Sequence, residues 1–246
     1  MNFTMKVTRR IAPLLLMSVQ TSADTIASYL QSQIPIDDKL QIKLKTIDLP
    51  VNINNKTVEN QFALSHQRLK ADVKIENNHF QALVNFSKSR FSKQVAINYN
   101  QFAQGISSSF CLYINSVSFR QNTVKKWARF YFTVFLKTLN IYNSTFEGPV
   151  EFFNSRFVGA VFFKYSTFSG PVEFKRSRFM NDVSFFKSTF KDNLDFTKLV
   201  ANGKVDFEYT QFLGDKVSFY GAKFDKEVHF NHAIVSAKLD FTQVKT

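Results

Sequence analysis

The sequence predicts an all-β fold, a solenoid of parallel strands with about 22 residues per coil. Between residues 36 and 241, three apolar positions recur every eleven residues, and Ser108 is the one exception to their apolar character. Two of the three positions are two residues apart, and in a strand such residues project to the same side. Gly148-Pro149 and Gly170-Pro171 lie inside the repeat. Proline within a helix costs about 3 kcal/mol, so these pairs argue against an eleven-residue helical coiled coil.

The complete coil is predicted to contain two eleven-residue units and four short strands. Segments 144–157 and 166–179 match at eleven of fourteen positions, whereas segments eleven residues apart are less similar. In each unit one turn is a residue longer than the other. Coils that stack at ~4.8 Å give a rod of about nine coils and about 45 Å. Between Phe212 and Val217 the spacing is five residues instead of four, which predicts a one-residue bulge at 213–216.

The repeating units carry a family resemblance. Successive units read Val150-Glu151-Phe152, Ser155-Arg156-Phe157, Val161-Phe162-Phe163 and Ser166-Thr167-Phe168. This pattern resembles the pentapeptide-repeat family, in its Phe-centred branch, and is most specific between residues 80 and 241. The resemblance implies a right-handed quadrilateral β-helix. The chain departs from the family in one extra residue per pair of pentapeptides, so one kind of corner is expected to be looser.

The N-terminus lies outside the repeat. Basic residues at positions 6, 9 and 10 precede the apolar run 11–19, and the small residues Thr21-Ser22-Ala23 follow. This order is typical of a secretory signal peptide over residues 1–23, which predicts export to the periplasm or the secreted space. The alternative is a disordered or amphipathic N-terminus that stays on a cytoplasmic protein.

A short helix is predicted at residues 24–35, before the repeat domain at 36–246. Ile26, Leu30 and Ile34 share one helical face, and Pro35 ends the helix. A solenoid needs its open end covered, so we expect this helix to cap the first coil. No equivalent follows Phe241, and the last coil is expected to expose unpaired backbone. That edge predicts a homodimer through the C-terminal coil.

The sequence contains no recognisable catalytic constellation, cofactor motif or metal motif, so we expect no enzyme and no cofactor. Its four histidines lack the partners of a metal site. Glu151, Glu173 and Asp195 follow one another in an outward column, after Arg129. Paired carboxylates can perform acid–base chemistry, but a ladder of charge pairs is the preferred interpretation. Cys111 stands at a position usually taken by Ser and is expected to point inward.

One face of the predicted rod carries an apolar strip, the candidate interface. Its outward residues are Leu112, Ile114, Val134, Leu136, Arg156, Val158, Arg178, Met180 and Val200. A contiguous apolar surface usually marks an interface. The alternatives are that a segment of the same chain, such as 24–35, covers the strip, or that it reflects strand propensity alone. On this basis we expect a non-catalytic scaffold that binds a protein partner.

Charge suggests a second function. The formal net charge is +13. Such a surface attracts nucleic acid, anionic membranes or acidic polysaccharide, although lysines can also serve solubility alone. Members of the resembled family that imitate DNA to inhibit topoisomerases need an acidic surface, so the charge excludes that role.

Overall fold

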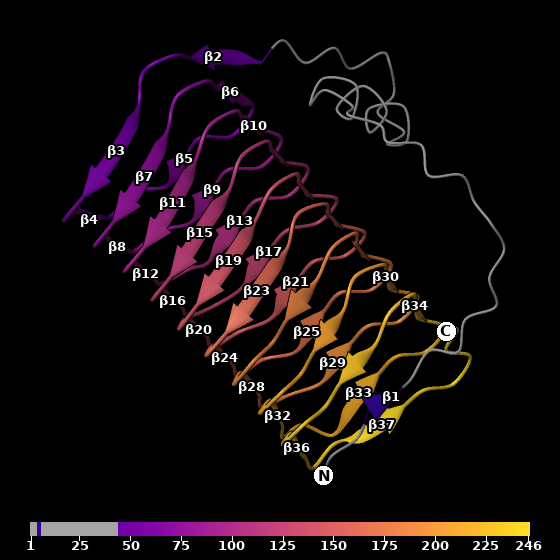
Figure 1. The fold of residues 1–246 in the computed structure, drawn as a ribbon. Coiled ribbons are helices and arrows are strands. Elements are labelled where there is room, and N and C mark those ends of the chain that lie inside the picture. Colours follow the sequence, from indigo (N-terminus) through magenta and orange to yellow (C-terminus); the bar gives the residue numbers. More distant parts are fainter. Residues whose placement is uncertain (1–3, 6–43) are drawn as a thin grey trace, which may run out of the picture.

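The computed structural model describes residues 4–5 and 44–246, and these form a β-solenoid of about nine coils. Four parallel sheets, here called A to D, make the four sides of a rod (Figure 1). The predicted all-β quadrilateral fold with about 22 residues per coil is confirmed. The predicted capping helix at 24–35 and most of the predicted leader at 1–23 lie outside the described residues.

The strands are short and follow a fixed order along the chain. Sheet A contains β1 (Thr4–Met5), β3 (Val51–Asn54), β7 (Val73–Glu76), β11 (Val95–Asn98), β15 (Val117–Arg120), β19 (Leu139–Tyr142), β23 (Val161–Lys164), β27 (Val183–Ser184), β31 (Val205–Asp206) and β35 (Val228–His229). Sheet B contains β2 (Lys45–Ile47), β6 (Gln67–Leu69), β10 (Arg90–Phe91), β14 (Leu112–Tyr113), β18 (Val134–Phe135), β22 (Arg156–Phe157), β26 (Arg178–Phe179), β30 (Val200–Ala201) and β34 (Lys223–Phe224).

The other two sheets complete each coil. Sheet C contains β4 (Thr57–Val58), β8 (His79–Phe80), β12 (Gln101–Phe102), β16 (Thr123–Val124), β20 (Thr145–Phe146), β24 (Thr167–Phe168), β28 (Thr189–Phe190), β32 (Gln211–Phe212) and β36 (Ile234–Val235). Sheet D contains β5 (Phe62–Ala63), β9 (Val84–Asn85), β13 (Ile106–Ser107), β17 (Ala128–Arg129), β21 (Val150–Glu151), β25 (Val172–Glu173), β29 (Leu194–Asp195), β33 (Lys216–Ser218) and β37 (Lys238–Asp240). Because the chain passes through B, A, C and D in turn, sheet B lies opposite sheet C, and sheet A lies opposite sheet D.

Stacked coils keep a constant register until one insertion. Phe157 pairs with Phe179, 22 residues on, whereas Leu194 pairs with Val217. The predicted bulge at 213–216 is therefore confirmed at the corner between sheets C and D. Gly214 lies here, and a Cβ at this position would come within 2.4 Å of the Asp192 carbonyl carbon. The corner absorbs the extra residue because each coil contacts only its neighbours.

Phenylalanine rings fill the core and stack along the rod axis. Phe146, Phe168 and Phe190 are fully buried, and their ring centroids lie 5.1 and 4.9 Å apart with the rings almost parallel. These distances match the spacing of adjacent parallel strands. Burying one such side chain contributes about 1.5–3 kcal/mol, so the inward columns of the sequence supply the main stabilising force.

The longer turn of each eleven-residue unit contains a left-handed residue. Asn55, Tyr99 and Phe110 have φ angles of 56°, 60° and 58°, and the same conformation recurs once per unit. These turns join sheet A to sheet C and sheet D to sheet B. A left-handed conformation costs a non-glycine residue about 1–2 kcal/mol. The extra residue that distinguishes the chain from ordinary pentapeptides is therefore accommodated at two of the four corners.

Between residues 77 and 188, a ladder of buried residues, polar except for Cys111, directly follows the left-handed residues. The hydroxyl of Ser177 accepts the N–H of Ser155 at 2.9 Å and donates to the carbonyl of Phe152. Cys111 occupies the same position, is buried, and directs its thiol to the Phe86 carbonyl at 3.0 Å. Burial raises the pKa of the Cys111 thiol to about 11. The inward orientation expected for this cysteine is confirmed.

The two ends of the rod differ. Beside the last coil, β1 pairs antiparallel with β35, so part of the predicted leader occupies the open edge of sheet A. Lys245 bridges to Lys223 next to β34. Within the described residues, β36 and β37 have no further strand beyond them. Among the described residues, the last coil thus exposes the edges of fewer than its four strands.

Candidate interaction surfaces

The residues of the apolar strip lie together on sheet B. Parallel register places Leu112, Val134, Arg156, Arg178 and Val200 beside one another on β14, β18, β22, β26 and β30. The second row consists of Ile114, Leu136, Val158 and Met180, each two residues further along its coil. Each residue of this second row follows an inward Phe or Tyr, so it projects outward. The structure therefore assembles the whole predicted strip on one side of the rod.

Burial along the strip is uneven. Val134 and Leu136 are only 6% and 8% exposed and form a small apolar cluster with Leu112, Ile114 and Val158. Met180 is 47% exposed. Arg178 is exposed, whereas Arg156 and Val200 are half-buried. The middle of the strip is therefore shielded from water, and its C-terminal part is open.

The opposite face is polar. On sheet C, Thr145, Thr167 and Thr189 stand in register and are half-buried. Their side chains stack outward above the inward Phe146, Phe168 and Phe190 of the same strands. The contrast with sheet B shows that the apolar strip does not follow from the fold itself, because the same fold carries a threonine ladder opposite.

Sheet D carries the carboxylates that the sequence singled out, here called the charged ladder. Arg129, Glu151, Glu173 and Asp195 lie on adjacent strands. The Arg129 Nε donates to Glu151 Oε2 at 2.8 Å, and the Lys175 ammonium lies 3.9 Å from Asp195 Oδ2. Charge pairs between coils thus account for the ladder, with Arg129 paired to Glu151 and Lys175 to Asp195.

Glu173 of the charged ladder and the neighbouring Tyr131 have raised pKa values. Burial raises the pKa of Glu173, the nearby Lys175 opposes this shift, and the neighbouring Asp195 and Glu151 carboxylates add to it. Burial, then hydrogen bonding to Glu151, raises the pKa of Tyr131 to about 12. Arg129 also lies 4.4 Å from the centre of the Trp127 ring. A carboxyl group with a raised pKa beside a second carboxylate can exchange protons. The same two carboxyl groups are also explained as members of a structural ladder of charge pairs.

The corner between sheets A and C gathers exposed aromatic residues and cations. Tyr142 contacts Tyr165 at 5.4 Å, Phe186 contacts Tyr209 at 5.8 Å, and His232 stacks on Tyr209 at 4.7 Å between ring centres. The Lys187 ammonium lies 5.7 Å from the Tyr165 ring and 5.5 Å from the Tyr209 ring. We call this group the aromatic corner.

Sequence reasoning missed the aromatic corner. Two of its members, Tyr165 and Tyr209, are left-handed turn residues outside the apolar columns. The available signal was position: Tyr165 and Tyr209 directly precede the buried Ser166 and Thr210 and are 44 residues, or two coils, apart. A second aromatic group at the corner between sheets D and B contains Phe110 stacked on Phe132 at 5.0 Å.

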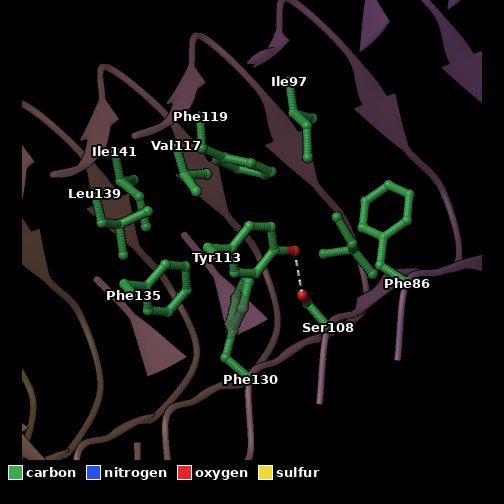
Figure 2. A pocket seen from close by; sticks show the side chains of 11 residues that line it. Phe86, Ile97, Ser108, Tyr113, Val117, Phe119, Phe130, Phe135, Leu139 and Ile141 are labelled. Atoms are coloured by element: carbon green, nitrogen blue, oxygen red, sulfur yellow. Dashed lines mark hydrogen bonds between the residues drawn. The ribbon is translucent and has the colours of Figure 1, made fainter. Parts of the chain in front are cut away.

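Ser108, the exception in the apolar columns, has a structural explanation. Its hydroxyl lies 2.5 Å from the Tyr113 hydroxyl inside the core (Figure 2). Both side chains are buried. A cavity of about 10 Å³ beside them is lined otherwise by apolar side chains such as Phe86 and Phe119. The small serine leaves room for the tyrosine oxygen and gives it a hydrogen-bond partner, which a buried hydroxyl requires.

Within the described part of the chain, no group of three His, Cys, Asp or Glu side chains could hold a metal ion. His229 hydrogen-bonds Glu227 at 3.1 Å. Over the same residues, no helix has the length and apolarity needed to cross a membrane.

Comparison with known proteins identifies the repeats. A family model described as pentapeptide repeats (9 copies) matches residues 141–189, 152–200 and 185–234. No curated protein and no solved structure matches the chain. The matched residues form Phe-stacked coils with four sides, as the resemblance implied, and the extra residue per pair of pentapeptides gives each coil about 22 residues. Residues 141–234 of the chain therefore carry pentapeptide repeats.

Proposed function

We propose that the protein is a non-catalytic scaffold that binds a protein partner through the apolar strip of sheet B. The observation that carries this proposal is the continuity of the strip over five coils, from Leu112 to Val200. Isolated apolar residues are common on protein surfaces, whereas a contiguous apolar patch is typical of an interface.

The rest of the molecule is consistent with this role. Stacked rings in the core and parallel hydrogen bonds on four sides make a rigid support, and a preorganised surface loses little conformational freedom on binding. Met180 and Arg178 are exposed at the C-terminal part of the strip, where a partner can first make contact. The flanking arginines favour a partner that combines apolar and acidic side chains.

A differential capture experiment tests the proposal. We expect Val158→Lys combined with Met180→Lys to abolish capture of a partner that the unaltered chain retains. The matched control is Thr167→Lys combined with Thr189→Lys, which adds the same charges to sheet C. Mass spectrometry should find a protein lost only with the strip variant. Identical sets of captured proteins from all three chains would contradict the proposal.

The aromatic corner favours a second candidate, the binding of an anionic polymer. Lys164 and Lys187 lie beside Phe162, Phe186 and Tyr209, and cations interleaved with aromatic rings suit single-stranded nucleic acid. We expect Lys164→Gln combined with Lys187→Gln to weaken binding and to reduce its salt dependence. Titrations with single-stranded RNA, heparin and anionic vesicles distinguish the polymers. Binding that is absent, or is unchanged in the variant, would remove this candidate.

Export and dimerisation stay predictions. The N-terminal sequence supports the prediction of export. Mass spectrometry of the chain purified from cells tests this prediction, because cleavage after Ala23 lowers the mass of the chain. The free edges of β36 and β37 support the second. Light scattering at micromolar concentration would then give twice the monomer mass, and a monomer mass would count against the dimer.

A further inference from the structure

The rings of the aromatic corner form a continuous row along the rod axis. Five successive coils each contribute one ring, from Tyr142, Tyr165, Phe186, Tyr209 and His232. Neighbouring ring centres in this row lie 4.7–5.8 Å apart. Because coils stack at ~4.8 Å, the row extends over about 19 Å. Tyr165 and Tyr209 are each 42% exposed, so the row presents an elongated aromatic surface to solvent.

The turn conformation does not explain these exposed tyrosines. Tyr165 and Tyr209 have φ angles of 56° and 55°. Asn adopts this left-handed conformation more readily than most residues, and Asn143 holds the equivalent position one coil before Tyr165. The backbone therefore does not require tyrosine here, and the large rings contribute a surface rather than a turn.

Three cations accompany the row and lack a carboxylate partner. In four successive coils this corner is formed by segments 118–123, 140–145, 162–167 and 184–189. These segments contain Arg120, Lys164 and Lys187 but no Asp or Glu. In the part of the chain that the structure describes, none of the three forms an ion pair with a carboxylate. Each lies instead 4.9–5.3 Å from the centre of an aromatic ring.

Rings interleaved with unpaired cations suit a ligand that carries both aromatic faces and negative charge. The bases of a single strand stack on aromatic side chains, and its phosphates are attracted to Lys and Arg. A duplex keeps its base faces inside its own stack, and an acidic polysaccharide has no aromatic ring, so either would use the cations alone. We propose that the aromatic corner binds single-stranded nucleic acid, with bases on the rings and phosphates at Arg120, Lys164 and Lys187.

This inference rests on the second candidate function, the binding of an anionic polymer, and names its ligand. Stacking on ring faces does not read the 2′-hydroxyl, so DNA and RNA strands should bind alike. Carboxylates limit the site at one end, because Asp206 and Glu208 lie on the same side of the next coil. The cationic part of the site therefore ends at Lys187.

Binding that depends on the bases tests the proposal. The full-length chain is titrated with a labelled dT strand of about 12 nucleotides, which is within the length that one binding groove covers, and with an abasic strand of equal length and charge. Fluorescence anisotropy measures both affinities. We expect the dT strand to bind more tightly by about tenfold or more, because only its bases can stack. A U strand of the same length should match dT.

Removing two rings should abolish this preference. Tyr165→Asn combined with Phe186→Asn should reduce the ratio of the two affinities to less than about threefold. Both substitutions suit the fold, since Asn143 and Asn98 hold the equivalent positions in other coils. The matched control is Phe110→Asn with Phe132→Asn at the corner between sheets D and B, which should leave both affinities unchanged.

Removing two cations should act on both strands alike. We expect Lys164→Gln combined with Lys187→Gln to weaken binding of the dT strand and of the abasic strand by the same factor. The slope of log affinity against log salt should fall by roughly 1.4, as expected for two lost contacts with a single strand.

The outcomes separate this inference from polymer binding in general. Equal affinities of the dT and abasic strands overturn the inference, but leave the second candidate function in place if the lysine variant still weakens both. A preference for dT that survives loss of Tyr165 and Phe186 also overturns it, because the bases then bind elsewhere. Absence of binding to any polymer overturns both. If circular dichroism shows that the double variant is unfolded, Tyr165→Asn alone decides by the same comparison.

Discussion

The first coils and the phenylalanine-rich coils build the same rod from different side chains. In the first coil, Ile47, Val51 and Val58 are only partly buried against the core, whereas Phe157, Phe163 and Phe168 in the middle are fully buried. Position explains the difference, because the first coil has a neighbour on one side only. The aliphatic Leu69, Val73 and Ile75 of the next coil are as fully buried as the phenylalanines, so the end position and not the side-chain type lowers burial in the first coil.

The buried polar ladder changes together with the core. Asn78, Asn100 and Asn122 donate to the carbonyls of Ile53, Ile75 and Ile97. Further along, Ser144 and Ser188 donate to the carbonyls of Phe119 and Phe163. The larger amide thus accompanies the smaller isoleucine, and the small hydroxyl accompanies the larger phenylalanine. From these pairs we expect the polar column and the apolar column to compensate each other in volume.

The largest expected effect is a difference in stability loss between the first coil and the phenylalanine-rich coils. Phe163→Ala removes a fully buried ring and is expected to destabilise the protein by about 3–5 kcal/mol. Ile53→Ala changes the equivalent position of the first coil, which is half-buried, and should cost less than about 2 kcal/mol. Urea unfolding followed by circular dichroism measures both. Equal losses would break the comparison.

Exchanging the polar ladder tests volume compensation. Ser188→Asn adds atoms beside Phe163, and overpacking of this kind costs about 1–3 kcal/mol. Asn100→Ser leaves room beside Ile75 but keeps a hydroxyl that can reach the carbonyl, so we expect a loss of about 1 kcal/mol. Combining Ser188→Asn with Phe163→Ile should recover part of the first loss. No recovery in the double variant would contradict compensation between the columns.

A smaller effect concerns the outer faces. The charged ladder belongs to the phenylalanine-rich coils, whereas the equivalent residues of β5 and β9 are Ala63 and Asn85. The pKa of Glu173 is raised in the folded state. Its contribution to stability is therefore full below the pKa of the unfolded chain and is lost as pH rises through the folded value.

We accordingly expect Glu173→Gln to raise Tm at pH 7 and to make no difference below about pH 3, where both states are protonated. Calorimetric scans across this range measure the change. The exposed Glu147→Gln is the matched control and should leave Tm unaltered. A Tm for Glu173→Gln that is lower than that of the unaltered chain at pH 7 would contradict the direction of the pKa shift.

Periodicity made most of the fold predictable. Apolar columns specify which side chains point inward, and the 22-residue similarity specifies how coils pair, as Phe157 and Phe179 show. The insertion at 213–216 was visible because it displaces a column. Ser108 could not be explained in advance, since its reason is a contact with Tyr113 across the core. The aromatic corner was missed because turn residues lie outside the columns.

The apolar strip was predictable residue by residue, but its burial was not. Alternation along β14, β18 and β22 gives the outward residues directly. The low exposure of Val134 and Leu136 depends on how the side chains of their cluster pack together, which spacing within the repeat does not reveal. Likewise, β1 pairs with β35 although the two strands are more than 200 residues apart in the sequence. A strand of two residues contains too short a sequence pattern for this pairing to be predicted.

Disulfide formation between outward cysteines tests the central claim, that two eleven-residue units close one coil. Thr145 and Thr167 are in-register neighbours on sheet C, and adjacent parallel strands bring Cα atoms within the range that a disulfide spans. Arg156, midway between them in sequence, lies on the opposite sheet. We expect Thr145→Cys with Thr167→Cys to oxidise readily within the monomer, and Thr145→Cys with Arg156→Cys to remain reduced. Crosslinking of the second pair with failure of the first would contradict the 22-residue coil.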